Sequence, residues 1–368
     1  MKYYVIAGEA SGDLHGANML KSLCKIDTTA EVRAWGGDRM QAEGATLVKH
    51  YRELAFMGFW EVAKNLRTIV KNIRFCKEDI TAFNPDALIL IDYPGFNLRI
   101  AKWAKEHKIP VHYYISPQVW AWKENRVHLM KTVIDYLYVI LPFEKSFFED
   151  KHQFPVDFVG HPLLDEIKNF DAGAEKTFKE THLIPLEKPI VALLPGSRTQ
   201  EVKKMLNVMV DVATDFPDYC FVVAAAPHLK DSLFENLPVK VVRNDTYKLL
   251  AHAKAALVTS GTATLETALF EVPQVVCYKT SALSYAIGKR VINLPHISLV
   301  NLILGEEAVP ERIQSSCNAA QLKTDLASLL KGSEAEKQRK AYGRLKNKLG
   351  GSGASDTVSK HITERTHA

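Results

Sequence analysis

The segment SGTATLE, from Ser260 to Glu266, has the residue types and spacing of a site for a nucleotide diphosphate. It follows a β-rich run at 255–259 and opens an apolar stretch that favours a helix. The free N–H groups and the helix dipole at such a junction can hold phosphates without a lysine or a metal. Glu266, one turn later, could accept both ribose hydroxyls. A plain capping box, with Ser260 or Thr262 as the cap, explains the motif as well.

Asp92 is a second candidate, because it ends the near-continuous apolar run at 86–91. Such a run predicts a strand buried on both faces of a parallel sheet, and ligands bind at the carboxyl ends of these strands. A general base at this place, within reach of an attacking hydroxyl, contributes about 10²- to 10⁴-fold to a rate. Asp92 could equally cap the helix that follows, and its position alone leaves both interpretations open.

Arg198 lies in the turn PGSR, after the predicted strand at 189–194. Its guanidinium could clamp a diphosphate with two hydrogen bonds and stabilise its departure as a leaving group. The alternative, an arginine that is merely exposed at a helix start, is electrostatically poor because the helix dipole favours anions there. The residue type therefore favours a functional role.

The loop GEASGDLHGA, from Gly8 to Ala17, follows the first predicted strand and consists mostly of small residues. Its glycines allow a ligand or a neighbouring segment to approach the backbone, and Ser11 or Asp13 can cap the next helix. The spacing matches neither the dinucleotide-binding fingerprint nor the P-loop, which disfavours an NAD-dependent dehydrogenase.

Strand and helix patterns alternate through both halves of the chain, so we expect an α/β protein with two doubly wound, Rossmann-like domains. We expect an N-terminal domain at 1–168, a polar linker at 169–188 and a second domain at 189–333. The remainder, 334–368, is expected to form a helix and tail, with the helix at 334–349 crossing back to the first domain.

Composition describes a globular protein of 368 residues, with 47% hydrophobic and 24% charged residues. The net charge of +5 allows an anionic partner, and we expect no nucleic acid. Five scattered cysteines indicate neither a disulfide framework nor a zinc site. The N-terminus lacks the pattern of a signal peptide, so we expect a cytoplasmic location.

The segment at 56–75 is amphipathic and basic, with four Lys or Arg residues and one acid. Such a helix can lie in a membrane interface, although an ordinary surface helix with its apolar side on the core explains the same pattern. The apolar residues expected at the membrane are Phe59, Trp60, Val62, Leu66, Ile69, Val70 and Ile73.

Nine segments, in this order along nearly the whole chain, resemble the lipid-A-disaccharide synthase family. They are GEASGDLHGA (8–17), MGFWEV (57–62), IDYPGFN (91–97), SPQVWAWKENR (116–126), LPFEK (141–145), VGHPLLD (159–165), LLPGSR (193–198), SGTATLE (260–266) and SLVNLILGEEAVPE (298–311).

The resemblance implies a GT-B fold, with two Rossmann-like domains facing across a cleft, and a metal-independent inverting transfer without a cofactor. The 2,3-diacylglucosamine of a UDP-linked donor would pass to the 6-hydroxyl of 2,3-diacylglucosamine 1-phosphate, giving the β-1,6 disaccharide of lipid A and UDP. By motif, the residues implied as catalytic are Asp92, Glu9 and Arg198. Those implied to bind the UDP donor are Arg198, Ser260, Gly261, Thr262, Glu266, Asn301 and Glu306. Those implied to line the substrate cleft are Gly8, Ser11 and Gly12.

Because both implied substrates carry acyl chains, the resemblance favours the membrane interpretation of 56–75, on the cytoplasmic face of the inner membrane, and it leaves room for a homodimer. Whether Asp92 or Glu9 takes the proton stays open. The chain departs from the family pattern at Gly95, where many relatives carry a second aspartate. The alternatives are a UDP-sugar 2-epimerase, which needs no lipid surface, and a non-catalytic, nucleotide-regulated membrane adaptor.

Overall fold

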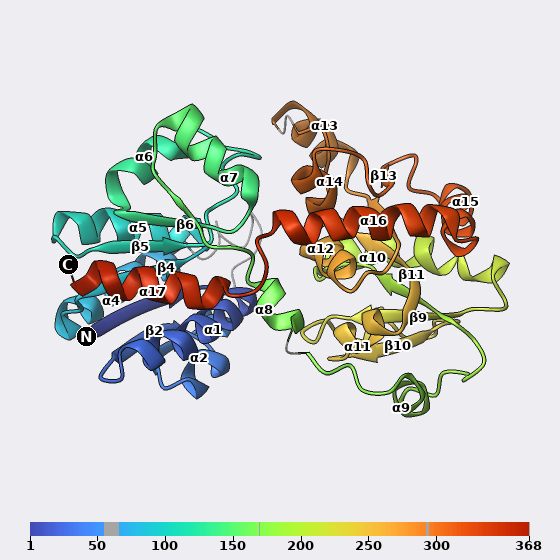
Figure 1. The fold of residues 1–368 in the computed structure, drawn as a ribbon, viewed down its shortest axis with the longest axis horizontal. Helices are drawn as coiled ribbons and strands as arrows, with labels where there is room; N and C mark the ends of the chain where they lie inside the picture. Colours follow the sequence, from blue (N-terminus) through green and yellow to red (C-terminus); the bar gives the residue numbers. More distant parts are fainter. Residues whose placement is uncertain (55–65, 169, 292–293, 368) are drawn as a thin grey trace. The chain divides into compact units, whose positions relative to one another are not determined.

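The computed structural model describes residues 1–54, 66–168, 170–291 and 294–367, and the chain divides into two compact units. Unit 1 comprises residues 1–165 and 349–368, and unit 2 comprises residues 166–348. Each unit is built on a parallel β-sheet with helices packed on it (Figure 1). The predicted α/β class with two doubly wound sheets is confirmed.

Unit 1 contains a seven-stranded sheet. Its strands are β1 (Lys2–Ala7), β2 (Glu31–Gly36), β3 (Thr46–His50), β4 (Ala87–Ile91), β5 (Val111–Tyr114), β6 (Tyr136–Val139) and β7 (Asp157–Phe158). They lie in the order β3-β2-β1-β4-β5-β6-β7, and all pairs are parallel. Alternate residues enter two separate cores, so that Tyr4 and Ile6 pack on one face and Tyr3 and Val5 on the other.

Helices cover both faces of this sheet. The helical segments of unit 1 are α1 (Ala10–Ile26), α2 (Asp38–Ala42), η1 (Tyr51–Glu53), α4 (Leu66–Phe83), α5 (Pro94–Glu106), α6 (Arg126–Val133), α7 (Pro142–Ser146), η2 (Phe147–Lys151) and α17 (Ala354–His367). Helix α8 (Leu163–Lys168) contains the boundary between unit 1 and unit 2. Neither Ser11 nor Asp13 caps α1, whose N-cap is Glu9 without a side-chain hydrogen bond. The buried Asp13 carboxylate instead accepts hydrogen bonds from Gly37 N (2.7 Å) and Met40 N (3.1 Å), and so fixes the start of α2.

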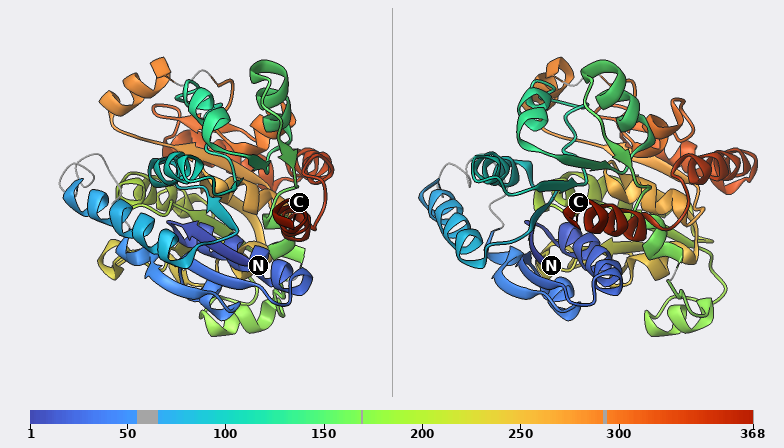
Figure 2. Two further views of the ribbon diagram at one scale, coloured as in Figure 1. Left: turned by 90° about the vertical axis from the view of Figure 1, so that its left-hand side faces the viewer. Right: turned by 60° about the vertical axis from the view of Figure 1, so that its left-hand side comes forward.

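The last helix, α17, completes the core of unit 1 and lies beside α1 (Figure 2). Its Val358 and Ile362 are fully buried against the sheet. Ser359 Oγ donates to Met19 O (2.8 Å), and Arg365 holds both carboxylate oxygens of Asp157 (2.6 and 3.2 Å). Unit 1 is therefore discontinuous in sequence.

Unit 2 contains a six-stranded parallel sheet. Its strands are β8 (Ile190–Leu194), β9 (Cys220–Ala225), β10 (Lys240–Arg243), β11 (Ala253–Thr259), β12 (Gln274–Tyr278) and β13 (Glu311–Ile313), in the order β10-β9-β8-β11-β12-β13. The helical segments are α9 (Glu175–Thr181), α10 (Thr199–Val210), η3 (Ala213–Asp215), η4 (Asp231–Leu233), α11 (Thr246–Ala251), α12 (Thr262–Leu269), α13 (Ala282–Val291), α14 (Leu299–Leu304), α15 (Ala319–Leu330) and α16 (Ser333–Lys348).

Two expected boundaries are wrong. The expected linker at 169–188 contains α9, whose Phe178 is buried against β8, so this stretch belongs to unit 2. The helix expected to cross back, α16, also stays in unit 2, because Gln338 and Tyr342 bond to Gln274 and Val272. Only the residues after Lys348 return to unit 1.

Candidate active site

The strand order of each sheet reverses at one place, and the candidate residues lie there. In unit 1 the reversal falls between β1 and β4, and in unit 2 between β8 and β11. The carboxyl ends of these four strands lead into Glu9, Asp92, Arg198 and Ser260. Such reversals leave a crevice at the carboxyl edge of an open α/β sheet, where ligands bind. The topology thus sorts the predicted residues into one candidate half-site in each unit.

The backbone at Asp92 is strained and firmly held. Asp92 and Tyr93 both have left-handed φ angles, 44° and 50°. Each such residue costs about 1–3 kcal/mol and persists only where its surroundings fix it. Here the carbonyl of Asp92 accepts hydrogen bonds from Tyr113 Oη (2.5 Å) and Asn97 Nδ2 (2.7 Å). The first residue of α5 is Pro94, and its N-cap is Tyr93, so Asp92 does not cap this helix.

The β1–α1 loop approaches Asp92 closely. A Cβ at Gly8 would overlap the ring of Tyr93, so only glycine allows the two loops to meet at this distance. Gly12 is buried against Ala7, whereas Ser11 and Glu9 are exposed. The structure therefore brings Gly8, Glu9 and Asp92 together, and it gives Gly12 a packing role.

The electrostatic environment of Asp92 suits a general base. Burial raises the pKa of Asp92 to about 6, the charge of Glu9 adds to the rise, and a hydrogen bond from the Tyr93 backbone opposes it. A base works best when its pKa lies near the working pH, since it is then both deprotonated and willing to take a proton. At neutral pH most of the Asp92 carboxyl is ionised.

Glu144 was not singled out from the sequence, although it lies in the LPFEK motif. It is buried and accepts hydrogen bonds from Trp120 Nε1 (3.0 Å), Leu141 N (3.0 Å) and Ile140 N (3.1 Å). Burial raises the pKa of Glu144 to about 7, and these hydrogen bonds partly offset the rise. With all three donors committed to it, Glu144 anchors the loops after β5 and β6.

In unit 2 the SGTATLE segment does not form a capping box. Helix α12 begins at Thr262, and its N-cap, Gly261, makes no side-chain hydrogen bond. The hydroxyl of Ser260 donates to Ile297 O (2.9 Å) instead. The N–H groups of the first turn are thus left without a side-chain cap, as the anion-cradle interpretation requires.

Glu266 points to a ligand more directly than any other residue of this segment. The described residues offer its side chain no hydrogen bond and no ion pair. Burial alone raises the pKa of Glu266 to about 7. A partly buried carboxylate without a partner is costly unless a ligand supplies hydrogen-bond donors. Two adjacent hydroxyls of a ribose would supply them.

Arg198 is available for a ligand. Its side chain is 68% exposed and contacts Glu201 at 3.3 Å, one turn into α10. An exposed ion pair of this kind contributes about 0–1 kcal/mol to stability, so an incoming diphosphate can displace it at little cost.

Asn301 has a structural role, contrary to its expected place in the UDP site. It is fully buried, and its amide bonds to Val309, Ala308 and Glu311. The Glu311 carboxylate also accepts from Ile297 N (3.0 Å). Because Ile297 O receives the Ser260 hydroxyl, Asn301 supports the segment from Ser260 to Glu266 indirectly. Its sequence signal was misleading because motif membership does not separate contact from support.

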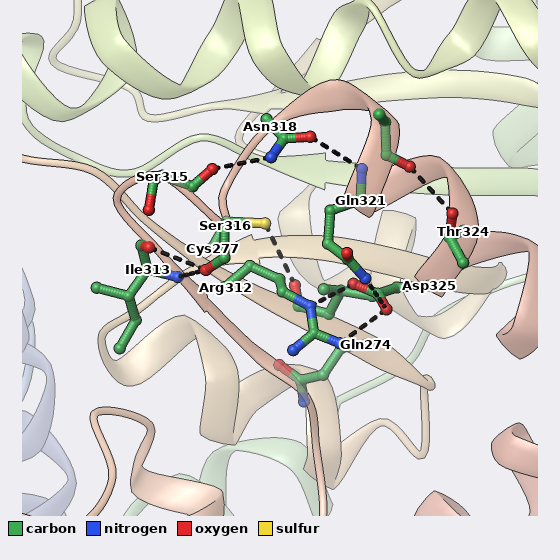
Figure 3. A network of polar contacts seen from close by, with 12 residues as sticks. Gln274, Cys277, Arg312, Ile313, Ser315, Ser316, Asn318, Gln321, Thr324 and Asp325 are labelled. Carbon is green, nitrogen blue, oxygen red and sulfur yellow. Dashed lines mark hydrogen bonds and ion pairs between the residues drawn. The ribbon is translucent and has the colours of Figure 1, made fainter.

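A polar network holds strand β13, which begins at Glu311 (Figure 3). Arg312 binds Asp325 of α15 with two hydrogen bonds (2.6 and 2.8 Å), and Gln321 donates to the same carboxylate (3.0 Å). Glu306 is ion-paired with Arg344 of α16 and lines a pocket of about 640 Å³ with Arg312 and Asp325. The structure therefore places Glu306 among α15 and α16 residues rather than with Ser260 to Glu266.

The expected membrane segment is only partly described. Phe59, Trp60 and Val62 lie outside the described residues, as does the side-chain environment of Leu66. Ile73 is partly buried and packs on the core of unit 1 that includes Cys76 and Ile80, which favours the core interpretation for this residue. This stripe faces inward because α4 must cover the sheet. Ile69 is partly buried, whereas Val70 is exposed, as is Phe75 nearby.

None of the helices in the described parts of the chain combines the length and apolarity needed to cross a membrane.

Solved structures of the same architecture identify the class of fold. A UDP-GlcNAc 2-epimerase from Neisseria meningitidis, bound to UDP-GlcNAc, matches 99% of this chain and 99% of its own, with a TM-score of 0.66 and 14% identity. The calicheamicin glycosyltransferase CalG4 matches 99% of this chain and 97% of its own, with a TM-score of 0.60 and 17% identity. The fold is that of the GT-B glycosyltransferases and the related epimerases.

Sequence comparison identifies the family. The family model described as lipid-A-disaccharide synthetase matches residues 3–361. A lipid-A-disaccharide synthase of Geobacter sulfurreducens is 37% identical over 371 residues, covering 98% of this chain and 96% of its relative. The chain belongs to the lipid-A-disaccharide synthase family and is a glycosyltransferase that forms the lipid A disaccharide. The family resemblance inferred from the nine segments is thereby confirmed, and the adaptor and epimerase alternatives lose their basis.

Proposed function

We propose that the protein transfers 2,3-diacylglucosamine from UDP-2,3-diacylglucosamine to the 6-hydroxyl of 2,3-diacylglucosamine 1-phosphate with inversion. The oxygen of the 6-hydroxyl forms a bond to the anomeric carbon of the donor, the bond from that carbon to the diphosphate breaks, and UDP leaves. The observation that carries this proposal is the strained, partly buried Asp92 at the switch point of unit 1.

In this reaction Asp92 takes the proton of the acceptor hydroxyl as the new bond forms. Glu9 keeps the pKa of Asp92 high enough for that transfer, after the contribution of burial. Asn97 and Tyr113 hold the Asp92 backbone in its strained conformation and act as positioning residues. Gly95 contributes no second carboxylate. A Cβ at this position would meet open space, so packing does not require a glycine there.

Unit 2 binds the donor in this proposal. The uncapped first turn of α12, at Gly261 and Thr262, holds the diphosphate, and the Glu266 carboxylate accepts the ribose hydroxyls. Arg198 neutralises the charge that develops on UDP as it leaves. The proposal assigns phosphate binding to these groups and needs neither a metal nor a cofactor.

We also propose that unit 1 associates peripherally with the cytoplasmic face of the inner membrane. The exposed apolar side chains Val70 and Phe75 lie on α4 among the basic residues Arg67, Lys71 and Arg74. Each cation near an anionic surface contributes about 1 kcal/mol to binding. Acylated substrates would be drawn from that surface.

The test is UDP release from UDP-2,3-diacylglucosamine in non-ionic detergent micelles, with and without 2,3-diacylglucosamine 1-phosphate. We expect acceptor-dependent UDP release and a disaccharide of the corresponding mass, with a β linkage by NMR. A product with an α linkage would overturn inversion. Equal UDP release without acceptor, or epimerised UDP-N-acetylglucosamine with no disaccharide, would overturn the transfer.

A further inference from the structure

The loop between β5 and α6 contains two tryptophans that the structure treats differently. Trp120 is anchored: its indole N–H donates to the buried Glu144 (3.0 Å), and its ring packs edge-to-face on Phe143, with centroids 4.8 Å apart. Trp122 has no such anchor and is 45% exposed. An exposed tryptophan on a loop held this firmly is available for a ligand, and its flat apolar face suits a sugar ring.

Two cations stand over this exposed ring. Lys123 Nζ lies 4.5 Å from the centroid of Trp122, and Arg126 Cζ lies 5.6 Å from it. Lys123 has a left-handed φ of 57°, an uncommon conformation for a lysine. A turn with a strained backbone therefore brings one aromatic ring and two positive charges together.

The acid of this loop does not neutralise them. Glu124 turns away and binds Lys151 Nζ (2.7 Å) and His152 Nε2 (3.0 Å). Among the described residues, neither Lys123 nor Arg126 has a carboxylate partner. A pair of uncompensated cations, one of them the planar fork of an arginine, is suited to bind a phosphate.

Arg126 lies near enough to Tyr113 for its charge to act on that phenol. Burial raises the pKa of Tyr113 well above its ordinary range, the Asp92 carboxylate adds to the rise, and Arg126 opposes it. Both charged groups therefore act on one phenol, whose hydroxyl bonds to the Asp92 carbonyl (2.5 Å). In a glucosamine, the carbons that carry the 6-hydroxyl arm and the 1-phosphate both flank the ring oxygen, so a 6-hydroxyl at Asp92 would leave the phosphate within one sugar ring of it.

We propose that Trp122, Lys123 and Arg126 form a subsite for the acceptor, in which the indole contacts the sugar ring and the two cations bind its phosphomonoester. This inference rests on the proposed function. It predicts that the enzyme selects a phosphorylated acceptor over the same diacylated sugar without phosphate.

The experiment compares two acceptors, 2,3-diacylglucosamine 1-phosphate and 2,3-diacylglucosamine, in non-ionic micelles. It uses the wild type, the double variant Lys123→Ala/Arg126→Ala, and Lys102→Ala, which removes an exposed cation of α5. Affinity is measured by titration calorimetry and turnover by disaccharide formation. In the double variant we expect binding and kcat/KM for the phosphorylated acceptor to fall by about ten- to a hundredfold, with the phosphate-free acceptor unchanged.

If the double variant loses affinity for both acceptors to the same extent, the two residues merely support the fold. If its discrimination between the two acceptors is unchanged, the phosphate binds elsewhere. Either result overturns the subsite. A third titration uses micelles that carry an anionic phospholipid instead of the acceptor, and so separates a lipid headgroup from the acceptor as the source of the phosphate. If the double variant loses affinity for these micelles by an equal factor, Lys123 and Arg126 are a membrane contact. Phosphate-selective binding in a wild type that makes no disaccharide would keep the subsite and overturn the proposed reaction.

Discussion

The switch points of the two sheets share one topology but present opposite chemistry. In unit 1, the strands on either side of the reversal lead into two acids, Glu9 and Asp92. Burial makes the largest contribution to the raised pKa of Asp92, and the charge of Glu9 raises it further. In unit 2, they lead to Arg198 and to an uncapped helix start, with Glu266 one turn deeper. The fold supplies the same edge twice, and the side chains make one edge suited to taking a proton and the other to holding an anion.

The largest expected effect is that of Asp92→Asn. Removing a general base should lower kcat by about 10²- to 10⁴-fold, while the affinity for UDP, which unit 2 provides, stays unchanged. Disaccharide formation and UDP titration on the same preparation measure both. Asp150→Asn, at an exposed position of unit 1, is the matched control. Normal turnover in the Asp92 variant would remove Asp92 from the mechanism.

Arg198→Ala should lower kcat by about 10²- to 10³-fold, because charge on the departing diphosphate is no longer stabilised. Its ion pair with Glu201 is exposed, so the melting temperature should hardly change. Arg198→Lys should recover only part of the rate, since a lysine cannot make two parallel hydrogen bonds. A loss confined to KM, with kcat intact, would show that Arg198 binds the donor without aiding the departure of UDP.

Glu266→Gln should weaken UDP binding by about ten- to a hundredfold, because hydrogen bonds to a charged group are lost. Titration with UDP and 2′-deoxy-UDP sharpens the assignment. The wild type should prefer UDP, and the variant should bind the two nucleotides more equally. The same preference for UDP in both proteins would place the ribose away from Glu266.

The last expected effect is on stability, and it has the same sign in both units. Burial raises the pKa of Asp92 from 3.8 to about 6 and that of Glu266 from 4.5 to about 7. Each raised pKa means that the folded protein binds a proton more tightly than the unfolded chain. Stability is then full below the unfolded pKa and is lost as the pH rises through the folded one.

Asp92→Asn and Glu266→Gln should therefore each stabilise the protein at pH 8, by up to about 3 kcal/mol, and leave stability near pH 4 almost unchanged. Denaturant unfolding at the two pH values measures this difference. Destabilisation at pH 8 would show that interactions of the carboxylate within the folded protein outweigh the cost of burying its charge.

The sequence predicted the sheets and the strand ends at which several candidate residues lie, because short patterns determine them. An apolar run such as 86–91 indicates a buried strand, and its last residue must lie at the carboxyl edge. A short sequence pattern does not show which distant residue each side chain will bond to. Asn301 and Ser260 share motifs with the site, yet their contacts with Glu311 and Ile297 depend on distant segments.

The domain boundaries were harder to predict for a similar reason. A polar stretch predicts a linker, but two apolar side chains within it, Phe178 and Ile184, pack into a core of unit 2. The return of α17 depends on Val358 and Ile362, which its sequence does not distinguish from the apolar residues of any surface helix.

The pH dependence of kcat, compared between the wild type and Glu9→Gln, tests most directly whether Asp92 is the base. The acceptor phosphate also titrates near pH 6, so the informative quantity is the difference between the two proteins. We expect the acid limb of the wild-type profile near pH 6 to move to lower pH in Glu9→Gln, because the variant removes a charge that raises the pKa of Asp92. Loss of that limb together with nearly all activity would instead make Glu9 the base and contradict the account.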